Sequence, residues 1–543
     1  MVLKLQPEDN IIIALESLEK GKEVIWDGRS YILQEYIPVK HKFAAQNFNI
    51  GDQLIMYGVV VGKATRYIAK GALISTENVV HYSEGFSSKK GKYEWQPLNI
   101  SRWKNRTFMG YHRADGKVGT ANHWLFVPLV FCQNRNIGVI QDVLNNALGY
   151  SKPSSYKSLI INLVKEYQQG ESISGTPQSV QSISEHRVFK NIDGIKFLNH
   201  QGGCGGTRDD ARALCQLLAG YIAHPNVAGA TVLSLGCQHA EVSWLNEAIE
   251  AIAPKLDKPV LVYEQQQESS SEEHFLSKVI SETFEALIEA NNISRKPAPL
   301  SKLCIGVECG SSDGLSGITA NPAIGYAADM IVSLGGSVIL SEFPELCGVE
   351  QELINRCVSD EKAAKFMKLQ RTYAARAESV GSGFDMNPSP GNIRDGLITD
   401  AMKSAGAAKK GGSAYVADVL DYTEQVTEPG LNLLCTPGND VESTTAMAGS
   451  GANLILFSTG LGTPTGNPIA PVVKVSSNTA LAEKLPYMID IDAGKMLTEH
   501  KSLEDMGEEI LEFCIKVASG EVQTKAQQLM QDDFIPWKRG VSL

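Results

Sequence analysis

Long apolar segments are absent from this sequence of 543 residues. A membrane-spanning helix needs about 20 mostly apolar residues, and the most apolar stretch, 318–340, is interrupted by Asn321, Pro322 and Asp329. The first ten residues also lack a basic segment followed by an apolar core, which is the pattern of a secretory signal. We therefore expect neither a membrane span nor secretion.

Basic residues are fewer than acidic residues. Lys and Arg number 50 against 61 Asp and Glu, which gives a net charge of −11 without an extended basic run. This balance argues against nucleic acid and against an anionic membrane as partners. Hydrophobic residues make up 43 % and charged residues 20 %, proportions that exclude wholesale disorder.

Closely spaced cysteines are lacking as well. The ten cysteines form no C-x-x-C motif and no dense framework, so a disulfide-rich secreted domain is excluded and a reducing compartment is favoured. We expect a cytoplasmic protein.

Short apolar runs divided by glycine turns predict an α/β fold in three parts. Residues 1–95 read as a small β-rich domain, in which Asp27-Gly28 is a hairpin signal. Residues 105–295 and 300–543 alternate strand, turn and helix, which predicts two α/β domains with mainly parallel sheets, the last of them catalytic. A polar stretch, 83–99, reads as a linker.

Polar motifs follow several predicted strands of the last part. They include Glu308 with Cys309, Glu342 with Glu345, and Gly/Pro-rich loops that carry Asn and Thr. Because ligands bind outside the carboxyl ends of parallel strands, we expect a site at this edge. Carboxylates beside hydroxyls and amides suit a polyhydroxylated ligand or a hard metal ion. Helix capping, tight turns and solvated glutamates explain the same residues without a ligand.

Four cysteines come directly after predicted strands, together with a histidine that opens a glycine-rich turn. These residues are Cys132, Cys204, Cys237, Cys309 and His200. Cysteine and histidine ligands suit iron, but small buried cysteines in a core explain the pattern equally. The turn at 200–206 also offers backbone N–H groups to an anion, and Arg208 follows it as a possible carboxylate partner.

Two residues of the first part have side chains suited to proton transfer. His41 and Lys42 follow the turn at Pro38, and either can act as an acid or a base if its pKa is lowered. An exposed basic pair without a catalytic role is the alternative.

Motifs spread over nearly the whole chain resemble those of the altronate/galactarate dehydratase family. They lie at 40–44, 57–58, 113–122, 200–204, 236–237, 308–322, 387–392, 436–440 and 459–464. The first two match the signatures of the small SAF domain that these enzymes carry. The resemblance is closer to the altronate than to the galactarate branch, notably at 431–434, 436–440 and 539–543.

The resemblance implies a hydro-lyase that eliminates water from D-altronate to give 2-dehydro-3-deoxy-D-gluconate in hexuronate catabolism. It also implies a divalent metal ion, with iron(II) as the expected ion and manganese as the second choice. The four cysteines and His200 lie at family motif positions. In this picture His41 and Lys42 transfer protons. The expected substrate-binding residues are Arg113, Arg208, Ser316, Asn321, Asn392, Asn439 and Thr463. We also expect a homo-oligomer.

The sequence departs from the family pattern at several positions. Lys40, Ala121, Gln238, Ser311 and Leu461 stand where many members have glycine, a basic residue, Glu, glycine and Arg, respectively. These changes bear on substrate identity, and Arg113 or Arg208 could replace the missing carboxylate partners. Two alternatives stay open: a dehydratase for galactarate or another aldonate, and a sensor that binds a sugar acid without catalysis.

Overall fold

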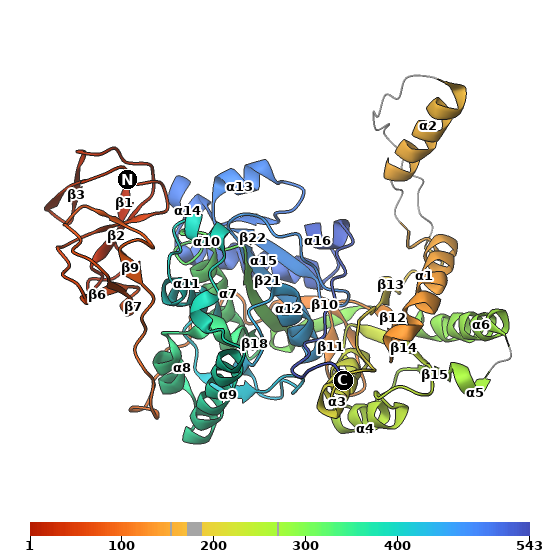
Figure 1. Ribbon diagram of the computed structural model, residues 1–543. Helices are drawn as coiled ribbons and strands as arrows, with labels where there is room; N and C mark the ends of the chain where they lie inside the picture. Colours follow the sequence, from red (N-terminus) through yellow and green to blue (C-terminus); the bar gives the residue numbers. More distant parts are fainter. Residues whose placement is uncertain (152–154, 171–186, 269–270) are drawn as a thin grey trace.

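The computed structural model describes residues 1–151, 155–170, 187–268 and 271–543. A β-rich N-terminal domain lies at one side, the C-terminal domain lies in the middle, and the second domain lies at the other side (Figure 1). The predicted α/β fold with a small β-rich N-terminal domain is confirmed.

The N-terminal domain consists of short antiparallel strands. They are β1 (Val2–Leu3), β2 (Ile11–Ala14), β3 (Glu23–Trp26), β4 (Arg29–Ile32), β5 (Lys42–Ala44), β6 (Gln53–Met56), β7 (Val59–Ala64), β8 (Leu73–Ile74) and β9 (Val79–Val80). Asp27 and Gly28 join β3 to β4 with φ values of 48° and 70°, so the predicted hairpin is confirmed. Ile12 and Phe43 are fully buried in this domain.

The predicted linker has no regular structure, but it lies against the C-terminal domain. The backbone N–H of Ser87 donates to Gln351, that of Leu98 donates to Ser333, and the Tyr93 hydroxyl donates to the carbonyl of Ser413. A small sheet follows, in which β10 (Thr107–His112) pairs with β11 (Val118–Gly119) and β16 (Lys296–Pro299). The segments before and after the second domain are therefore held together.

The second domain is a parallel four-stranded sheet in the order β13-β12-β14-β15. Its strands are β12 (His123–Pro128), β13 (Gly194–Phe197), β14 (Val227–Ser234) and β15 (Val260–Glu264). Its helices are η1 (Phe131–Gln133), α1 (Asn134–Leu148), α2 (Ser155–Gln169), α3 (Arg208–Ala223), α4 (Val242–Ile252), α5 (Gln265–Glu268) and α6 (Glu272–Ala290). Because β12 and β14 are buried along their whole length, they read as continuous apolar runs.

The C-terminal domain is a seven-stranded parallel sheet in the order β19-β20-β18-β17-β21-β22-β23. Its strands are β17 (Cys304–Gly310), β18 (Ser337–Leu340), β19 (Val416–Leu420), β20 (Gly430–Leu434), β21 (Leu454–Thr459), β22 (Val472–Ser476) and β23 (Ile491–Asp492). Its α-helices are α7 (Ala320–Ser333), α8 (Glu350–Arg356), α9 (Asp360–Ser379), α10 (Pro390–Arg394), α11 (Asp400–Ala407), α12 (Asp440–Gly449), α13 (Thr479–Lys484), α14 (Lys495–Thr498), α15 (Leu503–Ala518) and α16 (Lys525–Gln528). Its 3₁₀ turns are η2 (Leu300–Lys302), η3 (Phe343–Leu346), η4 (Phe384–Met386) and η5 (Ala408–Gly411).

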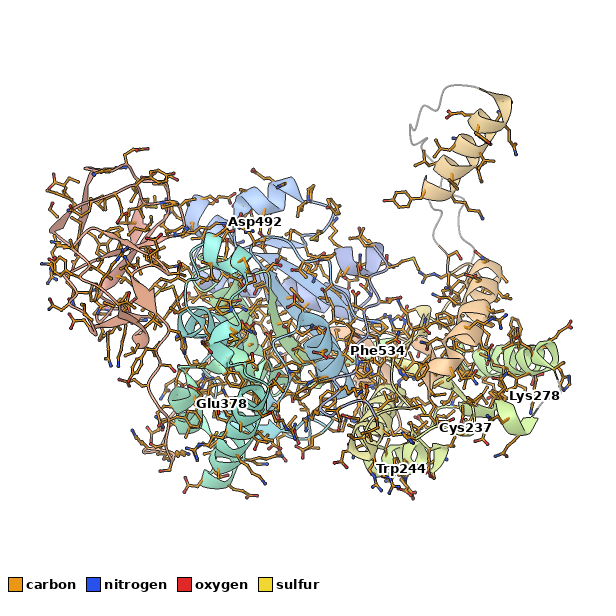
Figure 2. The ribbon with its side chains drawn as sticks, in the orientation of Figure 1. Cys237, Trp244, Lys278, Glu378, Asp492 and Phe534 are labelled. Carbon is orange, nitrogen blue, oxygen red and sulfur yellow. The ribbon has the colours of Figure 1, made fainter. Side chains whose placement is uncertain are left out.

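Apolar cores join the three parts. One core continues from the N-terminal domain into the C-terminal sheet, and another links α3 of the second domain to α12. Phe534 lies between the second and C-terminal domains (Figure 2), with its ring 5.0 Å from that of Tyr221. The chain then ends on the second domain, where the N–H of Leu543 donates to the carbonyl of Gly205. In the part of the chain that the structure describes, no helix is long and apolar enough to cross a membrane.

Candidate active site

Five neighbouring strands of the C-terminal sheet end in polar residues, and the sequence predicted this for four of them, all except β22. Loops after β17, β18, β20, β21 and β22 meet at this edge through hydrogen bonds. Asp313 lies at the centre of one group, accepting from the hydroxyls of Ser316 and Ser477 at 2.8 Å and from the amide of Asn478 at 3.1 Å. The carboxyl ends of the strands thus form one continuous polar region.

A buried charge cluster lies at the same edge. Its members are Glu308, Cys309, Glu342, Glu345, Lys403, Lys410 and Asp440. The Lys410 ammonium lies 2.7 Å from a Glu342 oxygen and 3.0 Å from the Cys309 sulfur. The Lys403 ammonium lies 2.5 Å from a Glu345 oxygen. Glu308, Glu342 and Lys410 are at most 1 % exposed, so these charges interact in a medium that screens them weakly.

The backbone at Glu342 adopts the left-handed conformation, with φ of 62°. Few residues other than glycine do so, and the strain is characteristic of functional sites. The Thr436 hydroxyl accepts from the Glu342 N–H at 2.8 Å, which holds this turn against the loop after β20. The strained turn directs both Glu342 and Glu345 into the buried charge cluster.

The carboxyl groups of this cluster differ in their affinity for protons. Burial, and then the Glu342 charge, raise the pKa of Glu308 well above its ordinary value. Burial, and then the charges of Glu342 and Glu345, raise the pKa of Asp440 to about 7. Burial acts in the same direction on Glu345, but Lys403 and Lys410 outweigh it and lower that pKa. At neutral pH the cluster therefore offers protonated and ionised carboxyl groups side by side.

Lys474 is a functional candidate that the sequence analysis missed. It lies within β22 and is fully buried, and none of the described residues forms a hydrogen bond with its ammonium nitrogen. Burial lowers its pKa to about 7, opposed by the charge of Asp440, and its nitrogen lies 3.3 Å from the ring centroid of Phe457. A lysine within the apolar run 472–475 was the signal for it.

The segment with His41 and Lys42 docks on this edge of the sheet. Lys40 bridges Asp313 and Asp395, with both distances 2.9 Å. The Lys42 ammonium is buried and donates to the carbonyl of Gly396 at 2.7 Å, and burial lowers its pKa to about 7. Burial also lowers the pKa of His41, whose Nε2 lies 3.0 Å from the carbonyl of Arg394. Lys42 is therefore not an exposed basic residue.

Five of the predicted substrate-binding residues lie at this edge and make protein contacts there. Ser316 donates to Asp313, Asn321 accepts from Ser458, Asn392 donates to the carbonyl of Ser312, Asn439 accepts from the N–H groups of Val441 and Glu442, and Thr463 donates to Ser311. Asn392 completes a capping box and Asn439 is a helix N-cap. The capping alternative therefore accounts for these two side chains.

The two predicted arginines lie at opposite ends of the second domain's sheet. Arg113 donates to Asn122, just before β12 begins, and to the carbonyl of Pro225. Arg208 is exposed and begins α3, after the loop at the carboxyl end of β13. The two arginines therefore do not face one common carboxylate, and substrate binding by either of them stays a prediction.

The predicted metal ligands divide between two domains. Cys132, Cys204 and Cys237 are exposed and follow β12, β13 and β14, which are adjacent strands of the second domain (Figure 2 labels Cys237). Backbone hydrogen bonds join the Cys204 loop to both neighbouring loops. Cys309 instead lies in the buried charge cluster of the C-terminal domain. One site formed by all of them is excluded, and iron binding by some of them stays a prediction.

His200 is already engaged through both ring nitrogens. Its Nε2 lies 2.7 Å from the carbonyl of Pro128, and its Nδ1 accepts from the N–H of Gly202 at 3.0 Å. Burial lowers its pKa to about 4, so the ring is neutral. With both nitrogens occupied, His200 as placed holds the turn together and has no lone pair left for a metal.

Within the described residues, three groups bring at least three potential ligand atoms within 4.8 Å of one another. They are His81/Cys347/Asp400, Cys309/Glu342/Glu345 and Glu308/Glu342/Asp440. In the second group, Lys403 and Lys410 already pair with the carboxylates. Glu342 also belongs to the third group, where Lys410 pairs with its Oε2. Its Oε1 and Oε1 of Glu308 are buried without a hydrogen-bond partner among the described residues. Unpaired buried oxygens make this third group the better fit for a divalent ion at the strand ends.

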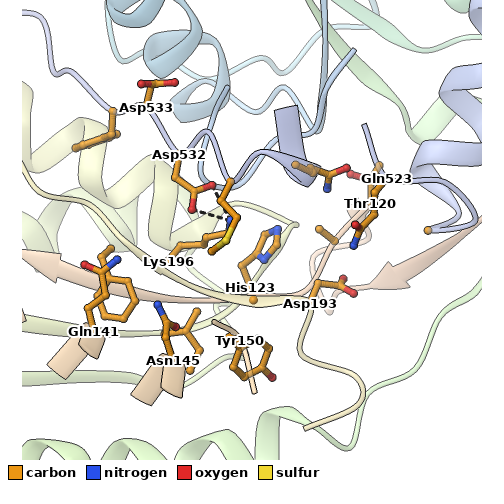
Figure 3. Close-up of a pocket in the computed structure, with 18 of the residues that line it drawn as sticks. Thr120, His123, Gln141, Asn145, Tyr150, Asp193, Lys196, Gln523, Asp532 and Asp533 are labelled. Carbon is orange, nitrogen blue, oxygen red and sulfur yellow. Dashed lines mark hydrogen bonds and ion pairs between the residues drawn. The ribbon is translucent and has the colours of Figure 1, made fainter. Parts of the chain in front are cut away.

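Two cavities lie beside the second domain. One of 530 Å³ runs between β13 and residues 517–535, where Lys196 pairs with Asp532 at 2.6 Å (Figure 3). The other, of 360 Å³, is lined by the Cys204 loop and by the segment 534–538. None of the predicted site residues lines the first cavity, whereas His200 and Cys204 line the second.

Comparisons with known proteins cover the whole chain. Residues 1–82 match the family model "Altronate/galactarate dehydratase SAF domain". Residues 110–291 match "D-galactarate dehydratase/Altronate hydrolase, second domain", and residues 300–542 match "D-galactarate/Altronate dehydratase, C-terminal".

Three curated relatives extend this similarity. Altronate dehydratases of Escherichia coli (strain K12) and Bacillus subtilis (strain 168) are each 32 % identical over 100 % of this chain and 99 % of their own length. The galactarate dehydratase (L-threo-forming) of Escherichia coli is 28 % identical over 97 % of this chain and 94 % of its own length. The chain therefore belongs to the D-galactarate/altronate dehydratase family.

Proposed function

We propose that this protein is a hydro-lyase that removes water from D-altronate and releases 2-dehydro-3-deoxy-D-gluconate. The observation that carries the proposal is the 32 % identity to curated altronate dehydratases over the whole chain. The polar region at the strand ends supports it, because the groups present there are those that the elimination requires.

The reaction needs a base, an acid and stabilisation of negative charge. The C2–H bond breaks and its proton passes to a base, which leaves charge on the carboxylate as an enediolate. The C3–O bond then breaks, and the leaving hydroxyl takes a proton from an acid and departs as water. The resulting enol becomes the 2-keto acid. A base alone is insufficient, because the enediolate carries two negative charges.

Groups with suitable proton affinity lie at the strand ends. We assign proton transfer to Lys42, with His41 beside it, since a lysine with a pKa of about 7 is partly neutral at physiological pH. His41 can supply the proton to the leaving hydroxyl. Glu308 and Asp440 are left to the metal ion, because metal binding requires their ionised form. Burial keeps these groups away from water, which strengthens their electrostatic effect.

The proposal includes a divalent metal ion, iron(II) or manganese(II). The orphaned oxygens of Glu308 and Glu342, together with Asp440, fit such an ion. A bound ion supplies Lewis-acid stabilisation of negative charge on the substrate. The alternative location for the metal ion is the predicted iron site formed by Cys132, Cys204 and Cys237.

An anaerobic assay of the purified protein tests the proposal. Formation of 2-keto acid from D-altronate should require iron(II) or manganese(II), stop on chelation and resume on metal addition. D-galactarate and other aldonates serve as the comparison panel. Metal-loaded protein that releases no 2-keto acid from any sugar acid would contradict the proposal, and binding of D-altronate without turnover would favour the sensor.

Galactarate is the second candidate substrate. The 28 % identity to a galactarate dehydratase over 97 % of the chain supports it. The departure at Leu461, which is 39 % exposed, bears on substrate identity without favouring either sugar acid. A higher kcat/KM for galactarate than for altronate would favour this candidate.

We also propose a homo-oligomer in a reducing compartment such as the cytoplasm. All ten cysteines are free, which supports the compartment. Helix α2 extends from the second domain and exposes Tyr156, Ile160, Val164 and Tyr167 at helical spacing, which supports association of copies. Light scattering of the wild type and of Ile160→Asp measures the oligomeric state, and a monomeric wild type would refute this part.

A further inference from the structure

Three metal-binding side chains meet outside the buried charge cluster. They are His81, directly after β9, Cys347, directly after η3, and Asp400, the first residue of α11. Their ligand atoms all lie within 4.8 Å of one another, and the Cys347 sulfur lies 3.9 Å from Nε2 of His81. Atoms around one metal ion have separations of this size.

One member of the group has an unsatisfied polar atom. Asp400 is fully buried, and in the described part of the chain its Oδ2 has no hydrogen-bond partner. Leaving a buried carboxylate oxygen unpaired is unfavourable, and such atoms are rare in folded proteins. A cation bound between the three side chains would satisfy this oxygen.

We propose that His81, Cys347 and Asp400 bind one divalent transition-metal ion, with Zn²⁺ as the best fit. A nitrogen, a thiolate and a carboxylate oxygen form a mixed ligand set that suits Zn²⁺, whereas Mg²⁺ and Ca²⁺ prefer oxygen ligands alone. Three protein ligands leave the fourth tetrahedral position to water.

The surroundings of the site are compatible with this ligation. The Ser83 hydroxyl lies 3.6 Å from the Cys347 sulfur and can donate to a thiolate. Ligation through Nε2 of His81 places the ring proton on Nδ1, so the interaction given up is the long contact of 3.4 Å with the N–H of Ala401. Glu350 is not part of the proposed ligand set, because its carboxylate accepts a hydrogen bond from the N–H of Gly348 at 2.6 Å.

The ion would clamp two domains together. His81 belongs to the end of the N-terminal domain, and the other two ligands belong to the C-terminal domain. Glu345 lies two residues before Cys347, and Lys403 lies three residues after Asp400. Glu345 and Lys403 form an ion pair of the buried charge cluster. The clamp therefore adjoins that cluster but shares no ligand with the Glu308/Glu342/Asp440 group.

Cobalt substitution tests the site independently of enzyme activity. The full chain is treated with a chelator and titrated with Co²⁺, which gives a thiolate-to-cobalt charge-transfer band when a cysteine ligates it. We expect Cys347→Ser to lose the part of this band that saturates at one equivalent, whatever Cys132, Cys204 and Cys237 contribute. The matched control is Cys304→Ser, a half-buried cysteine outside all three ligand groups, and it should keep the band.

The affinity for Zn²⁺ provides the second measurement. Asp400→Asn is nearly isosteric, so it removes the charge with little change in shape, and circular dichroism checks its fold. We expect Zn²⁺ affinity to fall by at least the about 10–100-fold that even outer-shell partners contribute. No charge-transfer band in the wild type, a band whose amplitude is unchanged in Cys347→Ser, or unchanged Zn²⁺ affinity in folded Asp400→Asn would each overturn the site.

Discussion

Lys410→Met tests whether the buried charge cluster is held together by its ion pairs. The Lys410–Glu342 pair is at most 1 % exposed, and Lys410 also donates to Cys309. Removing one partner of a buried pair costs about 3–5 kcal/mol, because the other charge stays uncompensated. For a domain of 150–250 residues, about 1 kcal/mol shifts Tm by about 2–4 °C. We therefore expect the Tm of the C-terminal domain to fall by about 6–20 °C.

Differential scanning calorimetry measures this change, with an exposed pair as the control. Lys365 lies 2.6 Å from Glu424, but their side chains are 35 % and 47 % exposed. Such pairs contribute about 0–1 kcal/mol, so Lys365→Met should shift Tm by no more than about 4 °C. The double variant Lys410→Met/Glu342→Gln should recover part of the loss, because the orphaned charge is gone.

The loss in Lys410→Met should also grow with pH. Burial raises the pKa of Glu342, and Lys410 opposes this shift, so the variant raises the pKa further above the unfolded value of about 4.3. The folded state then holds a proton that the unfolded state has released, and stability falls as pH rises above that value. A Tm equal to that of the wild type, or a loss that Glu342→Gln does not relieve, would refute the reasoning.

Three further variants test the site. Lys42→Met should lower kcat by about 10²–10⁴-fold and remove the rise of kcat/KM with pH that the Lys42 pKa of about 7 produces. The control Lys22→Met, at an exposed lysine, should leave this pH profile unchanged. Equal pH profiles for Lys42→Met and the wild type would exclude proton transfer by Lys42. His200→Gln should leave the iron content unchanged, because both ring nitrogens of His200 are already hydrogen-bonded. Its free energy of unfolding should fall by about 1–3 kcal/mol. A lower iron content, measured by mass spectrometry, would instead identify His200 as a ligand. Glu308→Gln should weaken iron(II) binding in titrations of chelator-treated protein, and unchanged affinity would move the metal elsewhere.

Local patterns predicted the arrangement of the chain. Apolar runs that end in polar turns and lead into helices predicted parallel strands with functional groups at their carboxyl ends, because a helical connection returns the chain to start the next strand in the same direction. The Asp27-Gly28 hairpin followed from turn chemistry. His41 and Lys42 were selected by their residue types, and the structure brings them to the same edge.

The sequence by itself thus determined the three-part α/β fold and the edge of the sheet at which polar groups gather. Only the tertiary structure decided which charges are buried together. Nothing in the local sequence distinguishes Lys403 and Lys410, yet packing places them against Glu345 and Glu342. His81 and Cys347 meet although 266 residues separate them. Periodicity describes neighbours along the chain, whereas proton affinity and ligand geometry depend on long-range packing and on the exclusion of water.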